Sequence, residues 1–250
     1  MRIVFFGTSH GFPEPNRRCS STLIEVGGAR YFIDMGTQSI ELLASHGMDV
    51  ESVKAVFVTH MHGDHANGLL SFIDLCGWYY KNANPKFYFP GDLEKTVFGI
   101  KTWLECLGTK KHDFRFEFNK VDDGFVYQDE NIKLTAFRTR HIAESFSYLL
   151  EAEGKRVFFS GDLEILRGSG EHTPDLPLDE FEKGFDLCIL ELAHFSAVDK
   201  YYKVLSENDK LKKIVINHYS KFMVGSGYEL CKLLPNHDIS FATDGLEIQL

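Results

Sequence analysis

The sequence is short of several features that mark common protein classes. None of its five cysteines belongs to a Cys-x-x-Cys pair and their number is odd, which argues against a disulfide framework or a thiolate metal site. No window approaches the ~20 consecutive apolar residues that cross a bilayer, so we expect no membrane partner. The opening run Ile3–Phe6 predicts a strand rather than a signal peptide. This cysteine usage favours the reducing cytoplasm.

Positive charge is also scarce. The chain has 27 Lys and Arg residues against 36 Asp and Glu residues, for a net charge of -9. A protein that grips nucleic acid non-specifically needs bulk positive charge, so that class is disfavoured, whereas bound divalent cations would offset the acidity. Apolar residues make up 44% of the 250 positions, enough for a sizeable core, and no low-complexity linker divides them. We therefore expect a single domain over residues 1–250.

The hydrophobic pattern predicts many hairpins, with helices between strands. Strands are expected at Ile3–Phe6, Thr22–Val26, Arg30–Asp34, Val53–Val58, Lys86–Phe89, Phe114–Phe118, Phe125–Tyr127, Ile132–Phe137, Phe146–Glu151, Arg156–Phe159, Phe185–Leu190, Ile214–Ile216, Ile239–Phe241 and Glu247–Leu250. Helices are expected at residues 38–46, 66–73, 92–107, 198–205 and 228–234, and a loop at 164–183. Each half of the chain has strands first and helices later, which indicates an α/β (α+β) fold of two sheets with helices outside.

The densest group of ligand-type side chains follows the predicted strand Val53–Val58. The stretch Thr59-His60-Met61-His62-Gly63-Asp64-His65 holds three imidazoles and one carboxylate in a turn that leads into a helix. Open α/β folds place their sites at such strand ends. Three histidines within six residues of a buried turn would cost stability if no metal paired them. The stretch therefore predicts a metal site.

Single ligand-type residues, His141, Asp162 and His218, stand just past the ends of three other predicted strands. Together with His60, His62, Asp64 and His65 they make seven nitrogen or oxygen ligands. A catalytic zinc usually takes three protein ligands, so seven fit two divalent ions that share one carboxylate, and Asp162 is the expected bridge. Zn²⁺ is the economical assignment, with Mn²⁺ or Fe²⁺ as alternatives. The remaining histidines are expected to be hydrogen-bonded or at the surface: His10, His46, His112, His172 and His237.

In type and order these residues resemble the motifs of the metallo-β-lactamase superfamily. Within it, the chain is similar to the ribonuclease Z-like branch, which comprises tRNA 3′-processing endonucleases and related phosphodiesterases. Further carriers of the resemblance are Gly7-Thr8-Ser9, Asp34-Met35-Gly36, Phe146-Ser147-Tyr148 and His218-Tyr219-Ser220. The resemblance implies a four-layer αββα sandwich with a binuclear site at one edge. It assigns one metal to His60, His62 and His141, the other to Asp64, His65 and His218, and both to Asp162.

The resemblance also points to Glu191 and His194. Glu191 resembles a glutamate that supports the ligands in that branch, and His194 lies in the region of its catalytic histidine, at a much shorter spacing from Glu191. We expect a metal-bridging hydroxide to attack the substrate, Asp64 to orient it and take its proton, and His194 to protonate the leaving group. Glu191 would hydrogen-bond a ligand imidazole. Arg17 and Arg18 would hold a phosphate oxygen or belong to a solvated loop.

The substrate is left open by the sequence. Only 21 positions separate His141 from Asp162, which leaves no room for the tRNA-gripping arm that many members of the branch carry between these motifs. The first hypothesis is a phosphodiesterase acting on a small-molecule phosphodiester or ester, with RNA as an open alternative. The second is a lactonase or another carboxylic-ester or amide hydrolase, and the third is a catalytically silent binding module. A homodimer is also left open.

Overall fold

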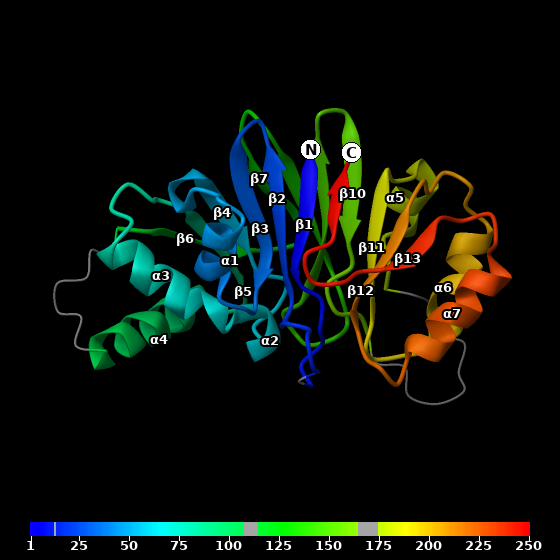
Figure 1. Ribbon diagram of the computed structural model, residues 1–250, viewed down its shortest axis with the longest axis horizontal. Coiled ribbons are helices and arrows are strands. Elements are labelled where there is room, and N and C mark those ends of the chain that lie inside the picture. Colours follow the sequence, from blue (N-terminus) through cyan, green and yellow to red (C-terminus); the bar gives the residue numbers. More distant parts are fainter. Residues whose placement is uncertain (13, 108–114, 165–174) are drawn as a thin grey trace.

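The computed structural model describes residues 1–12, 14–107, 115–164 and 175–250, and within them two seven-stranded sheets face each other (Figure 1). The first sheet contains, in spatial order, β14 (Glu247–Gln249), β1 (Arg2–Gly7), β2 (Ser21–Val26), β3 (Ala29–Met35), β4 (Val53–Phe57), β5 (Lys86–Pro90) and β6 (Glu117–Val121). The second contains β13 (Ile239–Phe241), β12 (Ile214–Tyr219), β11 (Leu187–Leu192), β10 (Lys155–Phe159), β9 (Phe146–Ala152), β8 (Lys133–Arg138) and β7 (Gly124–Gln128).

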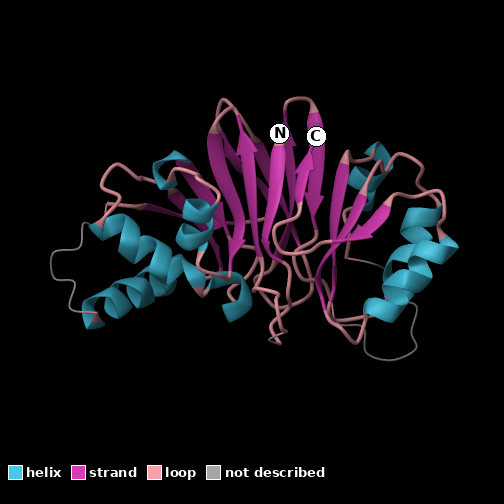
Figure 2. Ribbon diagram, in the orientation of Figure 1, coloured by secondary structure: helices cyan, strands magenta, loops and turns pink. Residues whose placement is uncertain are grey.

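Helices cover the outer face of each sheet (Figure 2). The first sheet is covered by α1 (Ser39–Ser45), the 3₁₀ helix η1 (Val50–Ser52), α3 (Gly68–Trp78) and α4 (Leu93–Cys106). The second sheet is covered by α5 (Leu178–Lys183), α6 (Ala197–Ser206) and α7 (Val224–Leu233). The short helix α2 (Gly63–Ala66) lies at one end of the sandwich. The predicted αββα arrangement is confirmed.

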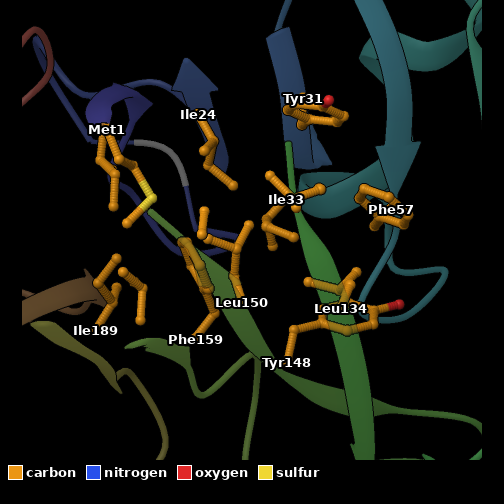
Figure 3. Close-up of a cluster of buried hydrophobic side chains, with 14 of the residues drawn as sticks. Met1, Ile24, Tyr31, Ile33, Phe57, Leu134, Tyr148, Leu150, Phe159 and Ile189 are labelled. Atoms are coloured by element: carbon orange, nitrogen blue, oxygen red, sulfur yellow. The ribbon is translucent and has the colours of Figure 1, made fainter. Parts of the chain in front are cut away.

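Side chains from both sheets fill the space between them (Figure 3). Strand β3 shows how one strand serves two layers. Tyr31 and Ile33 point into the cluster between the sheets, whereas Phe32 packs in the cluster beneath the helices. Successive side chains of a strand point to opposite faces, so a strand covered on both sides has a continuous apolar sequence. This double coverage holds the strand ends in fixed positions.

The carboxyl ends of parallel strands meet at one edge of the sandwich. Strand β4 pairs in parallel with β3 and β5, and β11 pairs in parallel with β10 and β12. Both chain termini lie at the opposite end from α2, the helix that follows β4 (Figure 1). Because parallel strands run in one direction, the segments that follow β4, β10 and β12 gather at the α2 end. These segments carry most of the predicted ligands.

Several predicted segments differ from the structure. The helix expected at 66–73 is found at Gly68–Trp78, with the short helix α2 before it, and the strand expected at Phe114–Phe118 begins only at Glu117 in its described part. The helix expected at 228–234 begins earlier, at Val224. Gly227 lets this first turn pack closely, because a Cβ there would lie 2.5 Å from Cζ of Phe241. The expected loop at 164–183 contains α5 in its described part. Glycine at the start of α7 and acidic residues in α5 are unfavourable for a helix by propensity alone. Burial against the sheet stabilises both helices.

Several expectations are not decided by the fold. No helix within the described ranges is long and apolar enough to cross a membrane. The single domain, the homodimer and the cytoplasmic location stay predictions. His112, His172 and the first residue of the expected strand Phe114–Phe118 lie outside the described residues. Of the rest of that strand, only Glu117 and Phe118 belong to β6.

Candidate metal centre

Ligand-type side chains from four segments meet at the α2 end of the sandwich. They form two groups, and within each group one ligand atom per residue lies within 4.8 Å of all the others. The first group is His60, His62, His141 and Asp162, and the second is Asp64, His65 and His218. All seven predicted residues are therefore brought together. The turn after β4 supplies members of both groups, which links the two halves of the centre through one short piece of chain.

In the first group, ring nitrogens face one another and one carboxylate oxygen. His62 Nδ1 lies 2.9 Å from His60 Nε2 and 3.2 Å from His141 Nε2. Asp162 Oδ2 lies 3.6 Å from Nε2 of both His60 and His141. Zinc–nitrogen bonds of about 2.0–2.1 Å in a tetrahedron put the ligand atoms about 3.3–3.4 Å apart. The spacing in this group therefore suits a single ion.

The second group faces the other oxygen of Asp162. Asp162 Oδ1 lies 3.4 Å from His65 Nε2 and 3.2 Å from His218 Nε2. Asp64 Oδ2 lies 3.5 Å from His65 Nε2 and 3.8 Å from His218 Nε2. Each oxygen of Asp162 thus points at a different group of imidazoles. This geometry would suit a carboxylate shared between two ions.

Two ligand-type atoms at the middle of the centre have no hydrogen-bond partner in the described part of the protein. Among the described residues, His65 Nε2 and Asp162 Oδ1 are buried and have no hydrogen-bond partner. A buried polar atom left in this way costs about 1–3 kcal/mol. Imidazole nitrogens and carboxylate oxygens together are the donor set of zinc and related divalent metals. The residues present therefore fit two such ions.

Burial and neighbouring charges set the protonation of the centre. Burial, together with the imidazoles around it, lowers the pKa of His60 to about 2, so the ring is neutral, the form in which imidazole binds a metal. Burial also lowers the pKa of His141. For Asp162 burial acts in the opposite sense, yet His218 and His65 hold its pKa well below the usual range. The Asp162 carboxylate is therefore ionised.

Two β-bulges aim side chains into the centre. Asp34 is left unpaired between consecutive pairs of β2 and β3, and His218 is left unpaired between consecutive pairs of β11 and β12. Both residues have a left-handed backbone, with φ of 60° and 46°. A bulge redirects a side chain from the regular alternation of its strand, and such bulges are common beside active sites.

Asp34 supports the centre from beneath. Its Oδ2 accepts a hydrogen bond from His65 Nδ1 at 2.7 Å, and its Oδ1 accepts one from the backbone N–H of Thr59 at 2.8 Å. In the sequence Asp34 stands out only as part of the motif Asp34-Met35-Gly36. We expected Glu191 to hydrogen-bond a ligand imidazole, and the structure shows Asp34 making that contact.

His194 reaches the first group despite its short spacing from Glu191. Its ring centroid lies 4.7 Å from that of His141, and its Nε2 lies 3.8 Å from Asp162 Oδ2. Glu191 Oε1 accepts hydrogen bonds from His194 Nδ1 at 2.8 Å and from the backbone N–H of Leu163 at 2.9 Å. Burial opposes protonation, but the hydrogen bond and charge of Glu191 raise the pKa of His194 to about 9. The His194 ring thus lies beside the centre with its Nδ1 occupied.

Arg17 and Arg18, for which the sequence left a phosphate contact and a solvated loop open, differ in how far their side chains are exposed. Arg17 Nη1 donates to Glu14 Oε2 at 2.8 Å and to the Tyr219 carbonyl at 2.9 Å, and the guanidinium lies 3.6 Å above the Tyr219 ring. Arg17 therefore braces the loop beside His218. Arg18 has a half-exposed side chain, 3.4 Å from Asp244. The described histidines outside the centre are hydrogen-bonded, as expected: His10, His46 and His237.

Comparison with known proteins places the chain in a family. A family model described as "Anti-Pycsar protein Apyc1" matches residues 1–223. The chain belongs to this family. Its fold is that of YhfI from Bacillus subtilis, a metallo-β-lactamase fold protein, with a TM-score of 0.74 over 99% of this chain and 98% of that one, at 17% identity. The predicted metallo-β-lactamase fold is confirmed.

The predicted resemblance to the ribonuclease Z-like branch is confirmed by similarity to further proteins. Ribonuclease Z of Saccharolobus islandicus is 30% identical over 157 residues, which cover 63% of this chain and 50% of the relative. The chain spans about half the length of the curated relatives it matches. A solved diphosphatase of the PhnP family has a TM-score of 0.70 at 18% identity, covering 99% of this chain and 97% of that chain.

Proposed function

We propose that this family member is a metal-dependent phosphodiesterase that works with two divalent ions, zinc by preference. The observation that carries the proposal is the position of Asp162, whose Oδ2 faces one group of imidazoles at 3.6 Å and whose Oδ1 faces another at 3.2–3.4 Å. A carboxylate shared between two ligand groups is typical of binuclear hydrolytic sites. A binding module that had lost catalysis would not need both groups intact.

The two ions would be held by separate sets of side chains. His60, His62 and His141 would hold one ion, Asp64, His65 and His218 would hold the other, and Asp162 would contact both. When bound, the ions would lower the pKa of a water and offset the negative charge on the oxygens of the attacked phosphoryl group. Neutral His60 and ionised Asp162 are in the protonation states that metal binding needs. Burial opposes protonation of His65, but Asp162 and Asp34 raise its pKa, so this ring would lose a proton when a metal binds.

The chain's own residues would then move the protons. Asp64 is only partly buried, with 15% of its side chain exposed, so an attacking water can approach its carboxylate, be oriented by it and pass it a proton. His194 would donate from Nε2 to the leaving oxygen, because Glu191 occupies its Nδ1 and turns Nε2 toward Asp162. Asp34 and Glu191 would keep His65 and His194 in their working tautomers.

A small-molecule phosphodiester is the proposed substrate class. The names of the compared ribonuclease Z and diphosphatase both denote enzymes that break phosphorus–oxygen bonds. The net charge of -9 opposes tight binding of a long polyanion. RNA and carboxylic esters are therefore the alternative substrates against which the assay below compares a small phosphodiester.

The test is hydrolysis by Zn²⁺-loaded protein of bis-p-nitrophenyl phosphate, set against a panel of lactones and an RNA substrate. We expect turnover of the phosphodiester, and near-complete loss in His62→Ala and Asp162→Ala with an unchanged circular dichroism spectrum. The control is His237→Ala, which removes a histidine that hydrogen-bonds the Asn208 carbonyl outside the centre, and it should keep full activity. Turnover of lactones alone would replace the proposal with an ester hydrolase.

A further inference from the structure

A second buried carboxylate lies behind the metal centre. Asp175, just before α5, has only 4% of its side chain exposed. Its Oδ2 accepts hydrogen bonds from the backbone N–H groups of Arg140 and Glu164, both at 3.0 Å. Its Oδ1 lies 2.7 Å from Nζ of Lys200, whose side chain is 1% exposed. One carboxylate therefore joins three segments of the chain.

Each of the three segments carries a residue of the centre. Arg140 immediately precedes His141, and Glu164 comes two residues after Asp162. Lys200 lies in α6, which begins three residues after His194. The same helix also contacts the strand below, because the Tyr201 hydroxyl donates to the Glu191 carbonyl at 2.6 Å.

Stability alone does not explain an ion pair in this position. Taking two charges out of water costs several kcal/mol, and an apolar pair of similar shape often stabilises a fold as well or better. The pair instead sets the position of the carboxylate, because Oδ2 accepts from the backbone N–H groups of two loops. Its Oδ1 lies against the Lys200 ammonium as a close ion pair without hydrogen-bond geometry. In other sites, hydrogen bonds from groups outside the ligand set orient the ligands; Asp175 would act one step further out, through the backbone of the ligand loops. Burial opposes ionisation, but the backbone donors and Lys200 lower the pKa of Asp175, so the carboxylate is charged.

We propose that Asp175, anchored by Lys200, is a positioning residue that sets the loops of His141 and Asp162 at the separation the first metal ion needs and holds the His194 segment against them. This inference rests on the proposed function for the presence of the metal, but not for the reaction. Asp175 touches neither substrate nor metal, and it acts through the backbone of the loops it holds.

The test compares Zn²⁺ affinity in Asp175→Asn with that in a matched variant. The substituted amide keeps the shape, but its NH₂ group must face either the backbone N–H groups or the Lys200 ammonium. The control is Asp129→Asn, at the opposite end of β8. Asp129 also accepts two backbone N–H bonds, from Asn131 and Ile132, both at 2.9 Å, and receives two tyrosine hydroxyls.

Competition with a chromogenic chelator should show Zn²⁺ bound about 10–100-fold more weakly by Asp175→Asn, with affinity unchanged in Asp129→Asn. With bis-p-nitrophenyl phosphate, kcat should fall at saturating Zn²⁺ while KM changes little. Unchanged Zn²⁺ affinity in Asp175→Asn, or an equal loss in Asp129→Asn, would overturn the inference. Wild-type protein that binds zinc but hydrolyses no phosphodiester would end the proposed function and leave this inference standing.

Two further measurements keep the inference testable if Asp175→Asn does not fold. Lys200→Gln should weaken Zn²⁺ binding in the same direction, because it removes the anchor of the carboxylate. In the wild-type protein, the amide protons of Arg140 and Glu164 should exchange as slowly as those of β10. Rapid exchange of either amide would show that Asp175 does not hold the loops.

Discussion

Asp34 Oδ2 accepts a hydrogen bond from His65 Nδ1 at 2.7 Å, and both side chains are almost completely buried. The bond fixes the tautomer of His65, because a ring nitrogen that donates carries the proton and leaves the other free as a lone-pair donor. His65 Nε2 faces Asp162 and Asp64. Asp34 therefore presents His65 Nε2 to Asp64 and Asp162, where the second proposed metal ion would lie.

Replacing Asp34 by Asn should weaken Zn²⁺ binding by about 10–100-fold. Asn is the cleanest change because it tolerates the left-handed backbone found at this position, φ 60°. It removes the negative charge that supports the imidazole and leaves the strand intact. Chelator competition measures the affinity, and circular dichroism checks the fold. Wild-type affinity in Asp34→Asn would show that the hydrogen bond to His65 has no role in metal binding.

The two β-bulges are features that the sequence could not predict. The hydrophobic pattern located most strands to within one or two residues, and the cluster from His60 to His65 was visible because the ligands are close together in the chain. The direction of the Asp34 and His218 side chains depends, in each case, on a register shift between two paired strands. No local pattern encodes such a shift, so the role of Asp34 could not be foreseen.

The position of the His194 ring beside His141 and Asp162 could not be predicted either, for a related reason. Its spacing from Glu191 is short for the branch it resembles, and the sequence alone gave no measure of where the segment turns. In the structure the end of β11 brings Glu191 and His194 into direct hydrogen bonding. Asp175 was equally hidden, because its partners Arg140, Glu164 and Lys200 are distant in sequence.

His194→Ala should affect substrates according to their leaving groups. A phosphodiester with an alkoxide leaving group needs a proton at the departing oxygen, so its kcat should fall by about 10²–10⁴. Bis-p-nitrophenyl phosphate releases a weakly basic phenolate, so its kcat should fall much less. Steady-state kinetics on both substrates, with zinc content measured in parallel, separates the two effects. Equal losses on the two substrates would remove His194 from the proton-donor role.

Two glycine substitutions should move stability in opposite directions. A Cβ on Gly36 would lie 1.8 Å from the Asp64 carbonyl oxygen, whereas one on Gly99 in α4 meets no described atom within 4 Å. We expect Gly36→Ala to lower the free energy of unfolding by at least about 1–3 kcal/mol and to displace Asp64. Gly99→Ala should raise it by about 1 kcal/mol because it improves helix propensity. Urea unfolding of both variants measures the two changes. A Gly36→Ala protein more stable than the wild type would contradict the close packing of Gly36 against the Asp64 carbonyl.

Acid should remove the contribution of Asp129 to stability. Burial opposes ionisation of Asp129, but bonds from the Tyr31 hydroxyl and from the backbone N–H groups of Ile132 and Asn131 lower its pKa. A carboxyl whose pKa is lower in the folded state stabilises above its unfolded pKa, about 3.9, and loses this effect as pH falls through the folded value. The gap in unfolding free energy between wild type and Asp129→Asn, about 1–3 kcal/mol, should be constant from about pH 5 to 8.

Below about pH 4 the same gap should narrow. Urea unfolding in the presence of a chelator, at steps from pH 3 to 8, measures the gap without any contribution from bound metal. A gap that widens on acidification would reverse the assigned direction of the Asp129 pKa.

The metal content of the reconstituted protein tests the central claim most directly. After loading with Zn²⁺ and removal of the excess by gel filtration, elemental analysis of the wild type should give about two zinc ions per chain. Asp162→Ala, which lacks the carboxylate between the two ligand groups, should hold one or fewer. A wild-type chain that retains one ion or none would contradict a binuclear centre bridged by Asp162.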